Sequence, residues 1–404
     1  MIKREFYLQK LREPKGLNVI KVITGARRVG KSTLLAQFRG ELLNNGVDKE
    51  HIIYYNLEDK LNEKFIQDVN LLHDTILKKI GNKKSRYYVF IDEVQLVPEF
   101  ERTLDSLFIR ENIDLYITGS NAYVTSSELS TLLSGRYIEI KMLPLTFSEY
   151  VQFFDGTKNM SELFAQFVEY GGFPEVANLL SSGLKTQVAS YLDAIYDTVI
   201  QKDISIRREV RNLEDFRNVV DYTLNNVGSI LSPNNIANVL RSENKIVNKQ
   251  TVGKYLDSMI DCSLIYRAKR YDIRGKQLLK TLEKYYAVDT GLTNQILGTP
   301  KNANLGHQIE NIVFLELKKR YGEVRIGMVG EKEVDFVVRN EEGVPEYFQV
   351  ALSVVDENTL QREVSSLESL NDNYTKTILT LDFLHSDERG IYRKNLVDWL
   401  LKSY

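Results

Sequence analysis

Thiols and long apolar runs are scarce in this chain, and their scarcity excludes several classes of protein. Cys262 is the one cysteine among 404 residues, which excludes an intramolecular disulfide framework and a cysteine zinc cluster. A chain without disulfides suits a reducing compartment, so we expect a cytoplasmic protein. No run approaches 18 apolar residues, and residues 1–7 lack the apolar stretch of a signal peptide. We therefore expect a soluble protein without a membrane partner.

A large excess of charge of one sign is also missing. The formal net charge is −2, which argues against a protein that coats nucleic acid uniformly, so any nucleic-acid surface must be local. His307 and His385 have no metal-ligand spacing with other histidines, cysteines or acidic residues. The composition, 43% hydrophobic and 27% charged, is that of a globular protein. A length of 404 residues predicts two to four domains.

The strongest motif is GARRVGKST, which fits the phosphate-binding loop pattern GxxxxGK[ST] and follows the apolar run 17–24. Glycines allow the backbone N–H groups to point inward at phosphate oxygens, with the next helix N-terminus behind them. The lysine reaches the β- and γ-phosphates, and the serine hydroxyl is a ligand for Mg²⁺. The alternative, a glycine-containing turn with an unrelated lysine, ignores the flanking strand and helix patterns. The predicted nucleotide-binding residues are Gly25, Ala26, Arg27, Arg28, Val29, Gly30, Lys31, Ser32 and Thr33.

A second motif has the form of a Walker B strand. Residues 87–91 are apolar or aromatic and precede Asp92 and Glu93. Buried parallel strands have such sequences, and ligands bind beyond their carboxyl ends, which places both acids beside the phosphates. Asp92 is predicted to hold Mg²⁺ through water or together with Ser32, and Glu93 to polarise the attacking water as a general base.

Two further polar positions have competing interpretations. The strand predicted over 113–121 ends in Ser120 and Asn121, which can position the γ-phosphate and the water or simply cap the next helix. Arg136 precedes a strand over 138–142 and is a candidate for supplying positive charge in the transition state. A surface or salt-bridged arginine is the equal alternative, because an arginine finger is defined by geometry.

These motifs, with the runs LYITGSNA, LSGRY, LPLTFSEY and GGFPE, resemble the AAA+-superfamily ATPases of bacteria and archaea that carry a conserved C-terminal domain of unknown function. The resemblance spans nearly the whole chain. The GGFPE run at 171–175 is its most specific part. Gly171 and Gly172 permit a tight bend and Pro174 stops a helix, so this run predicts the passage from the ATPase core to a helical lid.

The middle of the chain predicts helices followed by a winged helix. Residues 161–227 have a helical pattern, and helices are expected over 232–240 and 248–260. Two strands, 264–271 and 284–288, would complete the winged helix. Its local basic residues and the start of the second helix predict a DNA surface, and a lid or a protein contact is the equal alternative. These residues are Arg267, Lys269, Arg270, Arg274, Lys276, Lys280 and Lys284 in the wing, and Asn248, Lys249, Thr251 and Lys254 in the helix.

The final segment resembles the restriction-endonuclease-like fold. Glu310 lies on a predicted helix, Asp335 on a strand, and Gln349 and Ala351 on the following strand. An active member needs an acid and a lysine at the last two positions, which are neutral here. We therefore expect packing or binding rather than cleavage, unless a lysine from elsewhere substitutes.

The combined prediction is an α/β protein with a P-loop NTPase (AAA+-like) parallel sheet. Four domains are expected, namely an ATPase core (1–155), a helical lid or linker (156–228), a winged helix (229–300) and a catalytically degenerate endonuclease-like α/β domain (301–404). The resemblance implies an ATP- and Mg²⁺-dependent ATPase that acts as a switch on its C-terminal domains. Its catalytic residues would be Lys31, Glu93, Asn121 and Arg136. DNA, a protein partner in defence or signalling, and further copies of the chain are the candidate partners.

Overall fold

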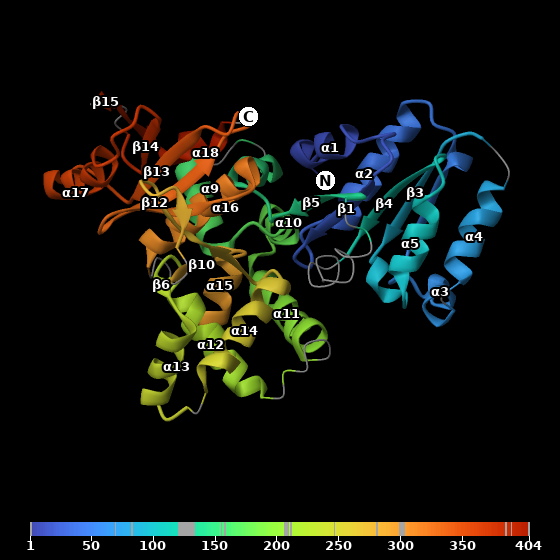
Figure 1. The fold of residues 1–404 in the computed structure, drawn as a ribbon, viewed down its shortest axis with the longest axis horizontal. Coiled ribbons are helices and arrows are strands. Elements are labelled where there is room, and N and C mark those ends of the chain that lie inside the picture. Colours follow the sequence, from blue (N-terminus) through green and yellow to red (C-terminus); the bar gives the residue numbers. More distant parts are fainter. Residues whose placement is uncertain are drawn as a thin grey trace. The chain divides into compact units, whose positions relative to one another are not determined.

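The computed structural model divides the chain into two compact units, Met1–Leu143 and Pro144–Tyr404 (Figure 1). Among the described residues, no helix combines the length and apolar character needed to cross a membrane. The first unit ends within the segment expected to be the ATPase core, and the other three expected domains fall in the second unit. The described residues are 2–68, 70–81, 84–119, 133, 135–154, 156, 159–205, 210, 212–245, 247–279, 282–298, 304–383, 386–388 and 390–402.

The first unit contains a five-stranded parallel sheet in the order β2-β3-β4-β1-β5. Strands β1 and β4 are buried along their whole length and β3 along most of it, as parallel strands covered on both faces require. The predicted P-loop NTPase fold is confirmed. Because β4 lies between β1 and β3, the end of β4 lies between the loops that follow the other two strands. The strands are β1 (Ile20–Gly25), β2 (Ile52–Asn56), β3 (Tyr87–Asp92), β4 (Ile113–Thr118) and β5 (Tyr137–Met142).

Helices cover both faces of this sheet. One face packs against α3 (Lys64–Gln67), α4 (Leu71–Ile80) and α5 (Phe100–Phe108), whose apolar residues share a core with β1, β2, β3 and β4. On the other face, Phe38 of α2 (Lys31–Asn44) packs against Phe90 and Tyr116. Helix α1 (Glu5–Arg12) packs beside α2. The strands that carry the predicted motifs at their carboxyl ends are therefore packed between two layers of helices.

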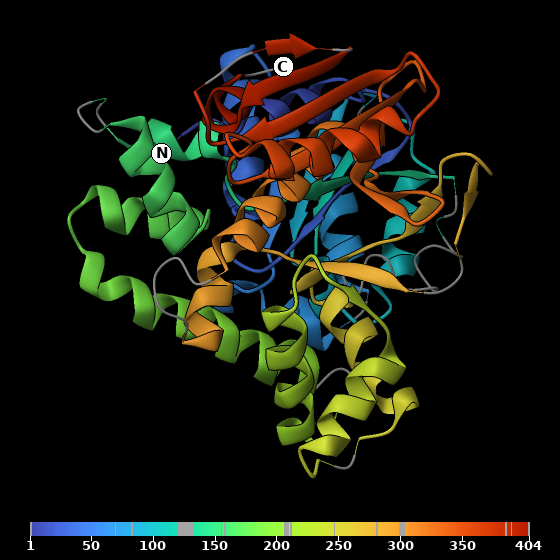
Figure 2. The ribbon, with the colours of Figure 1, turned by 90° about the vertical axis from the view of Figure 1, so that its left-hand side faces the viewer.

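The second unit begins with helices. They are α8 (Phe147–Tyr150), α9 (Met160–Tyr170), α10 (Pro174–Ser181), α11 (Val188–Thr198), a π-helical segment (Val199–Ser205), α12 (Leu213–Asn225), α13 (Pro233–Ser242) and α14 (Lys249–Asp261). Helices α13 and α14 are capped at their N-termini, since the Ser232 hydroxyl accepts from the Asn235 N–H and the Asn248 side chain accepts from the Thr251 N–H. Figures 1 and 2 show α12, α13 and α14 together at one end of this unit, away from its larger sheet.

Two sheets complete the second unit. The smaller has the order β6-β10-β7, and the larger has eight strands in the order β15-β16-β14-β13-β12-β11-β8-β9. Helix α16 packs on β12 and β13, while α17 packs on the other face through Leu360, Val364 and Leu367. The smaller sheet consists of β6 (Ile230–Leu231), β7 (Ile265–Ala268) and β10 (Glu283–Ala287). The larger consists of β8 (Arg270–Asp272), β9 (Gln277–Leu278), β11 (Arg325–Val329), β12 (Lys332–Arg339), β13 (Pro345–Ala351), β14 (Thr375–Thr380), β15 (Ser386–Glu388) and β16 (Ile391–Asn395). The remaining helices are α15 (Thr290–Leu297), α16 (Leu305–Tyr321), α17 (Glu357–Glu368) and α18 (Leu396–Leu401).

The single strand predicted over 264–271 is divided between two sheets. The chain leaves the smaller sheet after Ala268 and enters the larger one at Arg270, where β8 pairs with β11 in parallel. The Ile326 N–H of β11 donates to the Lys269 carbonyl at 3.0 Å, and the Ile273 N–H donates to the Met328 carbonyl at 3.0 Å, so the basic connection is part of a sheet. The antiparallel pairing of β7 with β10 is as expected.

The Gly-Gly-Phe-Pro run joins α9 to α10 inside the second unit. Gly171 has φ +77°, and a Cβ there would lie 2.0 Å from Asp289 Oδ1. The Gly172 N–H donates to Asp289 Oδ2 at 2.6 Å, and the Leu292 N–H donates to Asp289 Oδ1 at 2.8 Å. A bend at the glycines is therefore observed, and Pro174 begins α10. The run binds the N-terminus of α15 to the bend between α9 and α10. The two units divide earlier in the chain, after Leu143.

The titration of Asp289 should make the free energy of unfolding depend on pH. Burial raises its pKa from 3.8 to about 6, although the backbone N–H groups that donate to it oppose the shift. The folded chain binds the Asp289 proton more tightly than the unfolded chain does. The resulting contribution of Asp289 to the free energy of unfolding is therefore complete below pH 3.8 and is lost as the pH rises through about 6. Asp289→Asn removes the titration. The free energy of unfolding of the wild type minus that of the variant should fall by up to about 3 kcal/mol over this range.

The measurement is urea unfolding of both proteins between about pH 4 and about pH 7. Comparing the two chains cancels the titration of their other groups. A difference that stays constant over the whole range would contradict the assignment.

Candidate nucleotide-binding site

The loop after β1 has the backbone that phosphate binding requires. Gly25 has φ +141° and Gly30 has φ +100°, both in the region that favours glycine. A Cβ at Gly25 would lie 2.2 Å from the Met142 carbonyl oxygen, so the loop approaches the end of β5 too closely for any other residue. Arg28, with φ +65°, is a strained non-glycine residue at the exposed tip. The loop is thus a tight cradle that leads into α2.

Lys31 is buried in the first turn of α2. Its ammonium donates to the carbonyls of Gly25 and Ala26, each at 3.2 Å, and lies 3.9 Å from a carboxylate oxygen of Glu93. Phosphate oxygens would compete for these donors. Ser32 is exposed and Thr33 partly buried in the same turn. The structure therefore brings Lys31 and Glu93 together across the loop.

Asp92 ends β3 and is completely buried. Its carboxylate accepts from the Thr118 hydroxyl of β4 and from the Tyr54 hydroxyl of β2, the latter at 3.3 Å. Burial first, and then the charge of Asp92, raise the pKa of Tyr54 to about 12, so its hydroxyl stays a donor. The two neighbouring strands therefore hold Asp92 in one orientation.

Glu93 follows with φ +57°, a conformation that non-glycine residues rarely adopt. Its N–H donates to the Thr118 hydroxyl at 2.9 Å, and the Gln95 side chain donates to its carboxylate at 2.5 Å. The turn directs Glu93 toward Lys31. Strain at such a position is common where a side chain is aimed at a ligand.

Thr118 and Tyr54 are site residues that the sequence analysis did not single out. Both flank Asp92 only because of the strand order, in which β2 and β4 neighbour β3. Arg39 of α2 stacks on Tyr54, with its guanidinium carbon 3.6 Å from the ring centroid. Burial lowers the pKa of Arg39. A polar residue at the end of the strand beside the Walker B strand is the signal that could have found Thr118.

Two other predicted residues have different outcomes. Asn121, with Ser120, lies outside the described residues. Arg136 forms an ion pair with Asp105 and precedes the amino end of β5, where the Ile20 N–H donates to its carbonyl at 2.8 Å. The phosphate loop lies at the other end of the same sheet, roughly 17 Å along five residues of strand. The structure does not bring Arg136 together with its own loop, and a role on a neighbouring molecule stays a prediction.

The residues fit a nucleotide with Mg²⁺. In the part of the chain that the structure describes, no three His, Cys, Asp or Glu residues could hold a metal by themselves. Mg²⁺ usually binds through one or two protein oxygens, phosphates and water, so this does not conflict with a nucleotide-borne ion. Ser32 and Asp92 are the residues that would hold it.

Comparisons with known proteins identify an AAA domain in this chain. A family model described as "AAA domain" matches residues 18–151, and one described as "Domain of unknown function (DUF8612)" matches residues 161–303. An uncharacterized protein of Haemophilus influenzae is 38% identical over 410 residues, which cover 100% of this chain and 99% of that protein. The chain belongs to this family of AAA-domain proteins. The match supports an ATP-binding domain in the first unit.

Another curated protein and two solved structures are also similar to this chain. An uncharacterized protein of Methanocaldococcus jannaschii is 29% identical over 400 residues, or 94% of this chain and 85% of its own. The Walker-type ATPase of Pyrococcus abyssi has a TM-score of 0.49 at 16% identity and covers 73% of this chain and 96% of its own. The Aeropyrum pernix ORC1 protein in complex with DNA has a TM-score of 0.33 at 14% identity and covers 76% of this chain and 94% of its own.

The second unit of this AAA protein contains a buried ionic cluster. Lys284 of β10 lies 2.6 Å from Glu333 and 3.3 Å from Glu310, and the Tyr286 hydroxyl donates to Glu310 at 2.7 Å. Burial opposes the charge of Lys284, but the two carboxylates outweigh it and raise the pKa of the ammonium. The prediction that Lys284 belongs to an exposed basic wing is therefore wrong, because Lys284 neutralises buried acids.

The residues predicted by the endonuclease-like pattern lie beside this cluster. The Asp335 N–H donates to Gln349 Oε1 at 3.2 Å, the Val350 N–H donates to Asp335 Oδ2 at 2.8 Å, and Gln349 Nε2 donates to Glu363 at 2.7 Å. Burial and the nearby Glu310 charge raise the pKa of Asp335. A lysine from elsewhere, Lys284, does supply charge near Asp335, but its ammonium forms ion pairs with Glu310 and Glu333.

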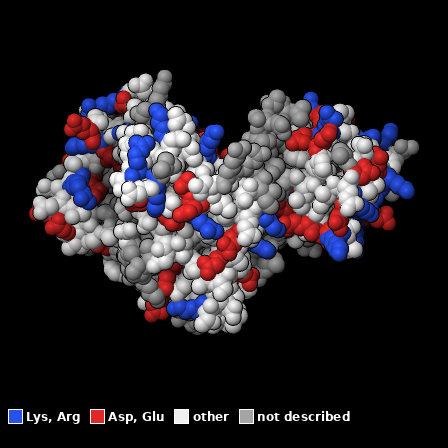
Figure 3. Space-filling model, turned by 90° about the horizontal axis from the view of Figure 1, so that it is seen from below, with Lys and Arg blue, Asp and Glu red and all other residues white. Residues whose placement is uncertain are grey.

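The basic residues of the expected DNA surface separate into two groups. Arg267 forms ion pairs with Asp257 and Glu283, and Arg274 donates to the Ser369 carbonyl. At the start of α14, Lys249 and Lys254 are exposed. Lys280 lies outside the described residues. On the face shown in Figure 3, basic and acidic side chains are interspersed, in keeping with the small net charge.

Proposed function

We propose that the first unit binds ATP with Mg²⁺ and hydrolyses it. The observation that carries this proposal is the convergence of Lys31, Asp92 and Glu93 at the carboxyl edge of one parallel sheet. Lys31 would neutralise phosphate charge, Asp92 would orient the metal through its waters, and Glu93 would take the proton of the attacking water. Mg²⁺ itself would neutralise charge on the phosphates. Substitutions at Lys31 and Glu93, assayed separately for ATP binding and for hydrolysis, test the proposal.

The same proposal includes a switch. Contacts to the γ-phosphate exist only before hydrolysis, so the ATP and ADP states differ in free energy, and any segment coupled to the loop can respond. We assign the C-terminal eight-stranded domain to packing or binding rather than to cleavage. Its lysine and acids satisfy one another, which supports that assignment.

DNA binding through α14 is the second candidate. Its support is the exposure of Lys249 and Lys254 in the first two turns of a helix that follows a helix and a turn. Lysines in that position are suited to phosphate contacts.

Charge reversal distinguishes this surface from the hairpin formed by β8 and β9. The double variant Lys249→Glu/Lys254→Glu should weaken binding to a DNA duplex and lower the salt slope by about 2. The matched double variant Lys269→Glu/Lys276→Glu, also exposed, should bind as the wild type does. Fluorescence anisotropy over a salt series measures both quantities. Equal losses in the two variants would show that α14 is not a distinct DNA surface, and no wild-type binding at low salt would exclude DNA binding.

A further inference from the structure

Arg4 is a buried arginine at the edge of the nucleotide loop. It is 4% exposed, which is rare for arginine, and it precedes α1, outside the residues 18–151 matched as an AAA domain. Its guanidinium donates to the Val29 carbonyl at 3.4 Å and to the Leu143 carbonyl at 3.1 Å. One side chain therefore joins the phosphate loop to the last residue of the first unit.

The contact with Val29 bears on the orientation of the next backbone donor, the Gly30 N–H. The Val29 carbonyl belongs to the same planar peptide unit as the Gly30 N–H, and the two groups point in opposite directions. Fixing the carbonyl therefore fixes the direction of the Gly30 N–H. In a loop of this pattern, such N–H groups bind phosphate oxygens. Arg4 is well placed to hold this donor in position without touching a nucleotide.

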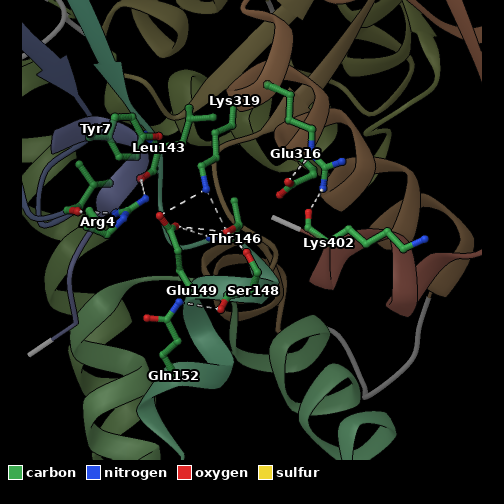
Figure 4. A network of polar contacts seen from close by, with 12 residues as sticks. Arg4, Tyr7, Leu143, Thr146, Ser148, Glu149, Gln152, Glu316, Lys319 and Lys402 are labelled. Carbon is green, nitrogen blue, oxygen red and sulfur yellow. Dashed lines mark hydrogen bonds and ion pairs between the residues drawn. The ribbon is translucent and has the colours of Figure 1, made fainter. Parts of the chain in front are cut away.

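Leu143 is held from both sides by the same N-terminal segment. Its carbonyl accepts from Arg4, and its N–H donates to the Tyr7 hydroxyl at 3.0 Å (Figure 4). The Arg4 guanidinium carbon lies 4.8 Å from the centroid of the Tyr7 ring. A movement of the Val29 carbonyl would therefore change a contact of the same guanidinium that donates to the Leu143 carbonyl.

The chain after Leu143 is fixed in the second unit. The Leu145 N–H donates to the Gly172 carbonyl at 2.7 Å, and Thr146 and Glu149 form a capping box at the start of α8. Lys319 of α16 lies 3.3 Å from both Glu149 and the Thr146 hydroxyl (Figure 4). Pro144 thus separates two backbone segments that are each held within their own unit.

We propose that Arg4 is a positioning residue of the nucleotide site, which orients the Gly30 N–H and transmits the state of the phosphate loop to Leu143. This inference rests on the proposed ATP binding. It adds a residue outside the loop motif. It also identifies Leu143, the last residue of the first unit, as the backbone position that responds to nucleotide binding.

The test uses the full chain with Arg4→Gln and Arg4→Lys. The matched control is Arg12→Gln on α1, which removes exposed ion pairs with Glu5 and Glu41. Calorimetry gives the Kd for Mg-ATP, and amide hydrogen exchange follows the N–H of Leu143 with and without Mg-ATP. Arg4→Gln should weaken ATP binding about tenfold, as loss of a supporting partner commonly does. It should also abolish the nucleotide-dependent change at Leu143. Arg4→Lys should recover part of both effects, and Arg12→Gln should match the wild type.

A second variant keeps the inference testable if Arg4→Gln does not fold. Tyr7→Phe removes the hydroxyl that accepts from the Leu143 N–H but leaves Arg4. It should keep the ATP affinity, and the Leu143 N–H, without its acceptor, should exchange rapidly both with and without Mg-ATP. Wild-type affinity together with a wild-type exchange response in Arg4→Gln would overturn the inference and leave the ATPase proposal intact. A wild-type chain that binds no ATP would overturn both.

Discussion

Lys31→Ala is expected to abolish ATP binding. Lys31 is the buried lysine of the phosphate-loop motif, and its ammonium donates to the Gly25 and Ala26 carbonyls. Charge-assisted hydrogen bonds to phosphate contribute about 1.5–3 kcal/mol each, so losing two of them weakens binding more than about hundredfold. Titration of the purified chain with Mg-ATP in a calorimeter measures the loss.

A matched control separates the loss of charge in the loop from a general loss of charge. Lys49→Ala removes an exposed lysine beyond α2 and should leave the Kd unchanged. Circular dichroism of both variants checks that the sheet is intact. ATP binding by a folded Lys31→Ala chain with wild-type affinity would remove the loop from the proposed site.

Glu93→Gln is expected to spare ATP binding and to stop turnover. The amide keeps the size of the side chain and its contact with Gln95, but it cannot accept the proton of the attacking water. General-base catalysis contributes about 10²–10⁴-fold, so kcat should fall by that factor while the Kd for ATP changes little. Phosphate release under steady-state conditions measures kcat.

Glu99→Gln is the control for this substitution. Glu99 also has a positive φ, of +51°, but it is exposed and pairs with Arg102. Its replacement should leave kcat unchanged. If purified Glu93→Gln protein turns over ATP as fast as the wild type, Glu93 is not the base.

The motifs near the loop could be predicted from sequence because each is local. Each motif is a contiguous run, namely Gly25 to Thr33 after β1 and the two acids at the end of β3. Its spacing alone places it at a strand end. Thr118 and Tyr54 could not be found in this way, because they reach Asp92 only through the order of the strands. Arg4 lies 25 residues from Val29 and 139 from Leu143, and no local pattern marks such contacts.

The second unit shows a different limit. The apolar run over 264–271 looks like one strand, yet pairing with β11 draws Arg270 and Asp272 into another sheet. Lys284 looks like part of a basic surface until β10 places it against Glu310 and Glu333. In both cases the partner is distant in sequence, and tertiary pairing overrides the local pattern.

The most direct measurement of the central claim is the identity of the nucleotide bound after the chain has been incubated with ATP and Mg²⁺. The wild type and Glu93→Gln are separated from free nucleotide, and the bound nucleotide is resolved by chromatography. The account predicts ADP on the wild type and intact ATP on the variant. Finding no nucleotide on the wild type, or the same fraction of ADP on both proteins, would contradict it.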